Sequence, residues 1–306
     1  MPRNFLSIDD LSERELADLL ELSEKVKAAP FDYGSRLAGL AVALIFEKPS
    51  TRTRVSFEVA CSSLGAHPVA LSSTELQLGR GETIEDTGRV LSRYVDAVVL
   101  RTFGQDRLEG LARTSTVPII NALSDFEHPC QCLADLLTVK EKKGKLCDLV
   151  MTYVGDGNNV AHSLLLGGAK AGMRVRVATP PGFEPIPQVV QRAEEIGAET
   201  GGGAEVLHDP LQACDGADVL YTDVWASMGQ ESEATERTLV FQGYQLDQGA
   251  VDRAAKDAIV MHCLPAHRGQ EITDEVIDGP HSVVWDQAEN RLHTQKALLL
   301  WLLGRA

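Results

Sequence analysis

Short apolar stretches recur along the chain and alternate with longer segments in which apolar residues return at helical spacing. A stretch such as Leu40–Phe46 is apolar throughout, a pattern typical of strands that are buried on both faces. We therefore predict strands at Leu40–Phe46, Ala97–Arg101, Val117–Asn121, Leu149–Val154, Arg174–Ala178, Ala204–Leu207, Val219–Thr222, Ile259–Cys263 and Val283–Trp285.

Helical patterns fill the intervals between these strands. Buried strands separated by helices imply parallel sheets that helices cover on both faces. The fold class predicted is therefore α/β, with two doubly wound parallel-sheet domains of similar size. The basic polar stretch KEKKGKL (140–146) marks the boundary, so the domains are expected at 1–142 and 143–286. The amphipathic helix predicted over 287–306 is expected to pack back on the first domain.

The bulk properties exclude several classes of protein. A length of 306 residues suits two domains. The chain has 29 Lys+Arg and 44 Asp+Glu, a formal charge of −15, which disfavours general binding to nucleic acid or to anionic membranes. The six cysteines are scattered, and we find neither a signal region nor an apolar run that could span a membrane. A cytoplasmic location is predicted.

One short segment conflicts with ordinary helix electrostatics. In IFEKPSTRTRVSFEVA (45–60), Ser50 is a good N-cap, yet Arg52 and Arg54 occupy the first turn, where acidic residues are favoured. The hydroxyls of Ser50, Thr51 and Thr53, the Arg52 guanidinium and the free N–H groups of a helix start could all bind one phosphate. The alternative is that the arginines pair with carboxylates distant in sequence.

Further polar residues follow other predicted strands, where ligands bind in open α/β sheets. Arg101 ends one strand; His128 and Gln131 open a helix and could bind a carbonyl oxygen and an amide nitrogen. Asp223 follows another strand and can bind an amine. Cys263 precedes Pro265, where packing is the usual role of a cysteine.

Two other interpretations of these loops stay open at this point. Gly155 and Gly157 begin a dinucleotide-binding fingerprint, but Val160 stands where its third glycine belongs. The pair Asn158 and Asn159 could instead bind a small carboxylate at a helix start. His128, Cys130 and Cys132 could hold a metal, although no matching second pair of ligands is present.

Taken in order, these segments resemble the motifs of the aspartate/ornithine carbamoyltransferase family. Ser50-Thr51-Arg52-Thr53-Arg54 is similar to its carbamoyl-phosphate signature, and His128-Pro129-Cys130-Gln131 to its H-P-x-Q motif. Asp223 with Ser227-Met228-Gly229, and His262-Cys263-Leu264-Pro265, are similar to the ornithine branch. The resemblance covers essentially the whole chain.

The resemblance implies a function and a set of residues. The carbamoyl group of carbamoyl phosphate would pass to the δ-amine of L-ornithine, giving citrulline and phosphate, without cofactor or metal. Residues implied to bind carbamoyl phosphate are Ser50, Thr51, Arg52, Thr53, Gln77 from a neighbouring subunit, Arg101, His128, Gln131, Cys263, Leu264 and Arg291. Those implied to bind ornithine are Asn159, Asp223, Ser227 and Met228. Catalytic roles are implied for Arg52, Arg101, His128, Gln131 and Cys263.

The resemblance also implies a homotrimer, or a multiple of trimers, with sites at subunit interfaces and a role in arginine metabolism. Putrescine and N-acetylornithine are alternative acceptors within the same framework. A dinucleotide-dependent oxidoreductase and a metal-stabilised binding protein using His128, Cys130, Cys132, His262 and Cys263 are the alternatives outside it.

Overall fold

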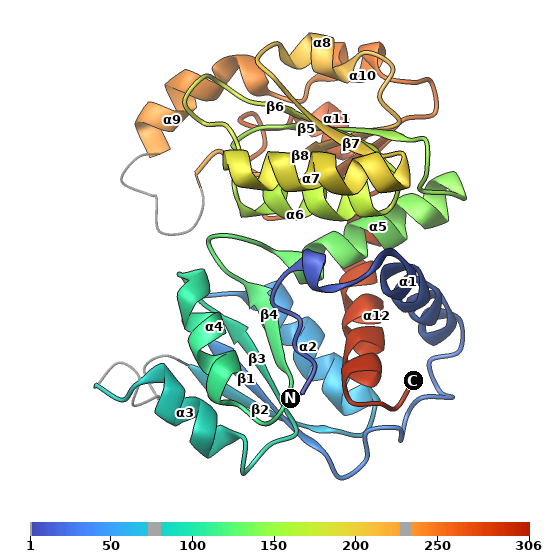
Figure 1. Cartoon of the computed structure of the whole chain (residues 1–306). Helices are drawn as coiled ribbons and strands as arrows, with labels where there is room; N and C mark the ends of the chain where they lie inside the picture. The colour runs from blue at the N-terminus through green and yellow to red at the C-terminus, as the bar shows by residue number, and fades with distance from the viewer. Residues whose placement is uncertain (1, 73–80, 227–233) are drawn as a thin grey trace. The chain divides into compact units, whose positions relative to one another are not determined.

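The computed structural model describes residues 2–72, 81–226 and 234–306. They form two compact units (Figure 1). Unit 1 comprises Met1–Leu133 and Arg291–Ala306, and unit 2 comprises Ala134–Asn290. The divisions fall inside helices α5 (Pro129–Lys143) and α12 (Val284–Leu302), so each of these helices contributes residues to both units.

Unit 1 is built on a parallel four-stranded sheet in the order β2-β1-β3-β4. Helices α3 and α4 cover one face, and α2 with the end of α12 covers the other (Figure 1). The elements are η1 (Ile8–Asp10), α1 (Glu13–Ala28), β1 (Ala41–Phe46), α2 (Thr51–Ser63), β2 (His67–Ser72), α3 (Ile84–Leu91), β3 (Ala97–Arg101), α4 (Gln105–Thr114) and β4 (Ile119–Leu123).

Unit 2 has a parallel five-stranded sheet in the order β7-β6-β5-β8-β9. Helices α6 and α7 cover one face, and α8, α10 and α11 cover the other (Figure 1). The elements are β5 (Val150–Val154), α6 (Asn159–Lys170), β6 (Arg174–Ala178), α7 (Pro187–Thr200), β7 (Gly203–Leu207), α8 (Pro210–Cys214), β8 (Val219–Thr222), α9 (Ala234–Phe241), η4 (Gln242–Tyr244), α10 (Gln248–Arg253), β9 (Ile259–His262) and α11 (Asp274–Ile277).

The predicted α/β class with two parallel sheets is confirmed, and two strand assignments need correction. Strand β2 was not predicted because Pro68 interrupts its pattern; the strand lies at the sheet edge, where proline is tolerated. The predicted strand Val283–Trp285 is wrong. Val283 donates its N–H to the carbonyl of Val260 and accepts from Gln287, so the chain touches β9 and turns at once into α12.

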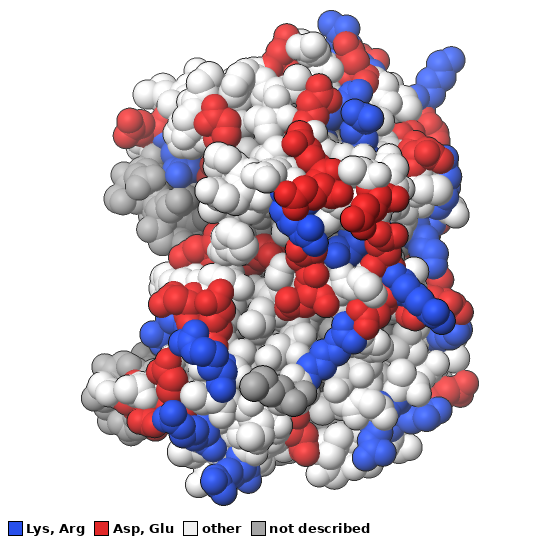
Figure 2. Space-filling model, viewed as in Figure 1, with Lys and Arg blue, Asp and Glu red and all other residues white. Residues whose placement is uncertain are grey.

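The described surface carries charges of both signs. On the face drawn in Figure 2, Lys and Arg side chains are interspersed with Asp and Glu side chains. No helix in the part of the chain that the structure describes has both the length and the apolar composition needed to cross a lipid bilayer.

Candidate active site

In unit 1, the loops that follow three strands meet at the carboxyl edge of the sheet, which is the end where the parallel strands terminate. Phe46 at the end of β1 pairs with Arg101 at the end of β3, and Arg101 pairs with Leu123 of β4. All three strands are parallel, so their carboxyl ends lie together. The segments that begin at Glu47, Thr102 and Ser124 therefore share this edge, which is where ligands bind in such sheets.

The predicted helix start after β1 is confirmed. Ser50 is the N-cap of α2, and its hydroxyl accepts a hydrogen bond from the Thr53 N–H at 3.3 Å. The first turn of α2 contains no acidic residue. Arg54 pairs with Glu58 one turn later, at 2.9 Å between Nε and Oε1, whereas Arg52 is exposed. Pairing with a carboxylate therefore accounts for Arg54. Arg52 lies exposed at the positive end of the helix dipole, where an anion would be favoured.

Buried guanidinium and imidazole groups accompany this helix start. Arg101, His128 and Arg291 are 7%, 5% and 5% exposed. The Arg291 Nη2 donates a hydrogen bond of 2.6 Å to the hydroxyl of Thr53, which ties α12 to the first turn of α2. Gln131 is buried in the first turn of α5. Unit 1 thus brings together hydroxyl, guanidinium, imidazole and amide groups, a set suited to a phosphate and a carbonyl oxygen.

The imidazole of His128 is neutral in this environment. Burial holds its pKa well below the ordinary value, and the positive charges of Arg291 and Arg101 lower it further. A neutral imidazole still carries one N–H donor. It can therefore polarise a carbonyl oxygen without adding a third positive charge to the site.

In unit 2, the corresponding edge carries a carboxylate. Val154 at the end of β5 pairs with Thr222 of β8, which pairs with His262 of β9. Asp223 and Cys263 consequently follow adjacent strands, and Asn158 and Asn159 begin α6 directly after β5. The predicted residues Asn159, Asp223 and Cys263 are therefore brought to one sheet edge.

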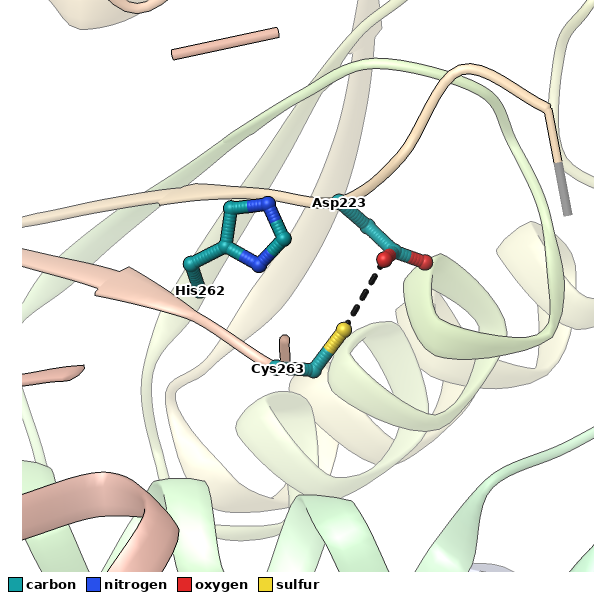
Figure 3. Close-up of side chains that lie close together, drawn as sticks. All are labelled: Asp223, His262 and Cys263. Carbon is teal, nitrogen blue, oxygen red and sulfur yellow. Dashed lines mark hydrogen bonds between the residues drawn. The ribbon is translucent and has the colours of Figure 1, made fainter. Parts of the chain in front are cut away.

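Both oxygens of Asp223 have fixed partners. The Cys263 thiol and the Val224 N–H donate to Oδ1 at 2.9 and 2.8 Å, and Figure 3 shows the thiol contact. The Asn158 amide donates to Oδ2 at 3.1 Å, while its own oxygen caps α6 by accepting from Val160 at 2.9 Å. Asp223 is 6% exposed, so these donors compensate a carboxylate that is largely removed from water.

His262 is not a base for Cys263. Its Nδ1 accepts a hydrogen bond from the Leu264 N–H at 2.8 Å, and its Nε2 lies 3.1 Å from Oε1 of the buried Glu271. Leu264 adopts φ +59°, a conformation that is uncommon for a non-glycine residue. The imidazole therefore holds the loop that contains Cys263 and Leu264, and the Cys263 thiol donates to Asp223 instead.

The structure weakens the two alternative interpretations of these loops. The buried Cys130 donates to the carbonyl of Asn121 at 3.2 Å, and burial raises the pKa of its thiol to about 12, which opposes metal ligation. One group of possible metal ligands occurs among the described residues, Asp223 with His262 and Cys263, and hydrogen bonds already engage it. A Cβ at Gly157 would lie 2.2 Å from the Pro185 nitrogen, so close chain packing accounts for this glycine.

Three predicted binding residues, Gln77, Ser227 and Met228, lie outside the described residues. The others are distributed between the units. Ser50 to Thr53, Arg101, His128, Gln131 and Arg291 belong to unit 1, whereas Asn159, Asp223, Cys263 and Leu264 belong to unit 2. Their functional roles stay predictions.

Comparison with known proteins assigns both parts of the chain to one family. The family description "Aspartate/ornithine carbamoyltransferase, carbamoyl-P binding domain" matches residues 3–141, and "Aspartate/ornithine carbamoyltransferase, Asp/Orn binding domain" matches residues 148–302. This chain belongs to the aspartate/ornithine carbamoyltransferase family. Within the family, it is 63% identical over 304 residues to the ornithine carbamoyltransferase of Parafrankia sp., covering 98% of this chain and 96% of that protein.

Solved structures of the family agree with this assignment. The ornithine carbamoyltransferase of Pyrococcus furiosus superposes with a TM-score of 0.95 at 54% identity, covering 99% of this chain and 97% of the other. That of Gloeobacter violaceus gives a TM-score of 0.90 at 51% identity, with 99% of both chains covered. The domain descriptions divide the family into the same donor and acceptor halves that the cationic and acidic sheet edges suggest.

Asn158 is a residue of this family member that sequence analysis did not place beside Asp223. From the sequence alone, Asn158 is a candidate to bind a small carboxylate ligand. In the structure its amide donates to the carboxylate of Asp223 instead. The two residues are 65 positions apart, so no local pattern could have joined them. The one available signal was an asparagine at a helix start after a strand, which indicates an N-cap.

Proposed function

We infer that this chain is an ornithine carbamoyltransferase, which transfers the carbamoyl group of carbamoyl phosphate to the δ-amine of L-ornithine and releases citrulline and phosphate. The observation that carries the inference is whole-chain identity of 54–63% to relatives named ornithine carbamoyltransferase, combined with Asp223 at the acceptor edge. The carboxylate of Asp223 attracts the amino groups of an acceptor such as ornithine, whereas it would repel the second carboxylate of an aspartate acceptor.

We assign the donor to the first domain, residues 1–142 with 287–306. The start of α2, from Ser50 to Thr53, binds the phosphate with its N–H groups, hydroxyls and the Arg52 side chain. Arg101 and Arg291 add buried charge, and Gln77 of a neighbouring subunit completes the phosphate site. His128 and Gln131 bind the carbamoyl group through its oxygen and its amide.

We assign the acceptor to residues 143–286. Asn159, Asp223, Ser227 and Met228 bind the amino-acid end of ornithine. The carbonyls of Cys263 and Leu264 accept the amide hydrogens of the carbamoyl group. Support comes from the closed hydrogen-bond set around Asp223, which fixes its carboxylate before any ligand arrives.

The chemistry requires no group beyond these side chains. The neutral δ-amine attacks the carbonyl carbon, and negative charge grows on the carbonyl oxygen. Phosphate leaves with the electron pair of the broken C–O bond and takes up the proton that the amine nitrogen loses. Arg101 and the neutral His128 donate to the developing oxyanion, the effect that is usually largest in such acyl transfers. The cationic donor site also favours the unprotonated form of the incoming amine.

We also propose the assembly and setting that the family resemblance implies. These are a homotrimer, or a multiple of trimers, with active sites at subunit interfaces, and a role in arginine metabolism in the cytoplasm. Sedimentation of the purified chain tests the assembly. A monomer with full activity would overturn the shared site and the role of Gln77.

Four acceptors distinguish the possible functions. Carbamoyl phosphate is supplied with ornithine, putrescine, N-acetylornithine or aspartate, and each carbamoylated product is measured. Citrulline from ornithine, with little product from the others, is expected. Turnover of another amine would retain the donor assignment and overturn the acceptor assignment. Absence of every product would overturn both.

A further inference from the structure

A carboxylate lies in the loop that would bind the phosphate. Glu47 directly follows β1 and stands three residues before the N-cap Ser50. Its N–H donates to the carbonyl of Arg101 at 2.9 Å, so the backbones of the two loops are joined here. An unpaired carboxylate at this position would repel a phosphate bound at the start of α2.

The guanidinium of Arg107, a residue of α4, pairs with the Glu47 carboxylate. Its Nε donates to Oε2 of Glu47 at 3.0 Å and its Nη2 to Oε1, so the contact is two-pronged. The buried Thr102 hydroxyl also donates to Oε2. The Glu47 side chain is 9% exposed and that of Arg107 is 36% exposed. Fork-like pairing of arginine with carboxylate is the strongest form of such a contact, and here it engages both oxygens.

We propose that Arg107 is a positioning residue for the donor site, which acts by neutralising Glu47 and so limits the repulsion between that carboxylate and a phosphate at the start of α2. The proposal rests on the proposed function, because it takes the start of α2 to be the phosphate site. Arg107 itself does not touch the substrate. Its effect on anion binding passes entirely through Glu47.

This route makes a prediction that simple loss of a positive charge does not make. Arg107→Gln leaves an unneutralised Glu47, and the affinity for carbamoyl phosphate is expected to fall on the order of 10-fold. Glu47→Gln removes the carboxylate itself, and affinity is expected to equal or exceed that of the wild type. In the double variant Glu47→Gln/Arg107→Gln no charge remains, so affinity returns to within about twofold of wild type.

The experiment is calorimetric titration of the full-length wild type and variants with carbamoyl phosphate and with inorganic phosphate, at low and high salt. The Arg107→Gln defect should shrink as salt rises, because partly exposed charges are screened. Arg113→Gln is the matched control: Arg113 is on the same helix, its side chain is 65% exposed, and it pairs with Glu85 at 3.4 Å. Its affinity should equal that of the wild type.

Two outcomes would overturn the proposal. One is an Arg107→Gln variant that binds as tightly as the Arg113→Gln control. The other is a double variant that stays as weak as Arg107→Gln, since Arg107 would then act directly or through the packing of α4. If Arg107→Gln does not fold, Glu47→Gln still decides, because weaker anion binding by that variant would contradict repulsion of phosphate by Glu47. A wild type that binds neither anion would overturn the proposed function as well.

Discussion

The two units use the same scaffold to present opposite charges. Each places functional residues after parallel strands, at the carboxyl edge of its sheet. Unit 1 gathers buried cations there, including Arg101 and Arg291, whereas unit 2 gathers a buried carboxylate with amide and thiol donors. The sheet supplies the position, and the residues after each strand decide what binds.

The two sites also differ in how their charge is held. Asp223 has donors on both oxygens, so its burial is already compensated by the protein. In unit 1, two arginines lie buried near a histidine whose pKa is lowered, an arrangement that a bound anion would stabilise. The contrast is between a carboxylate that the protein itself hydrogen-bonds and cations that a bound anion would stabilise further.

The largest expected effect comes from removing a cation of unit 1. Arg101→Gln keeps a polar side chain of similar reach but loses the charge that stabilises the developing oxyanion. Turnover should fall about 100- to 1,000-fold, the usual cost of one such donor. Citrulline production at saturating ornithine measures it, with Arg113→Gln as the control. Full activity of Arg101→Gln in a folded protein would remove Arg101 from the chemistry.

Sequence predicted more of the fold than of the contacts within the sites. Apolar strands alternating with helices specified both parallel sheets, and polar residues after strands pointed to both edges. The edge strand β2 was missed because Pro68 interrupts its pattern. The segment Val283–Trp285 was predicted as a strand, but only Val283 bonds to β9 before the chain enters α12. The bonds from Asn158 to Asp223 and from Arg107 to Glu47 join residues 65 and 60 positions apart, beyond any local pattern.

A charge removed from unit 2 should affect the acceptor alone. Asp223→Asn retains the shape and most of the hydrogen bonds of the carboxylate but not its charge. The KM for ornithine should rise about 10- to 100-fold, since a hydrogen bond to a charged group is worth roughly 1.5–3 kcal/mol. Affinity for inorganic phosphate, measured by calorimetry, should stay unchanged.

Asp215→Asn is the control for that comparison, because Asp215 is a half-exposed carboxylate of the same unit that pairs with Arg253. It should change neither quantity. If Asp223→Asn weakened phosphate binding as much as ornithine binding, the division of labour between the two edges would be wrong.

Acid should destabilise the donor site through His128. The pKa of His128 is lowered in the folded protein. Below the ordinary histidine pKa of about 6.5, the unfolded chain therefore binds a proton at this residue that the folded chain does not bind. The free energy of unfolding therefore falls as pH drops below that value, by up to about 1.4 kcal/mol per pH unit from this residue. Above it, this residue contributes no pH dependence.

His128→Gln removes that contribution, so its stability should fall less steeply between neutral and mildly acid pH than that of the wild type. Denaturant unfolding across this range measures the difference. Parallel curves for His128→Gln and wild type would mean that His128 binds protons equally in the folded and unfolded proteins, so that folding does not lower its pKa.

The smallest expected effect separates the thiol of Cys263 from its backbone. Cys263→Ser keeps the carbonyl that is proposed to bind the carbamoyl amide, and its hydroxyl can still donate to Asp223. Because one hydrogen bond to the Asp223 carboxylate is exchanged for another, turnover with ornithine should fall only about 3- to 10-fold. The exposed Cys147, as Cys147→Ser, controls for loss of a thiol. Full activity would make the thiol a packing group, whereas a loss as large as that of Arg101→Gln would place it in the chemistry and end the contrast between a reacting unit 1 and a binding unit 2.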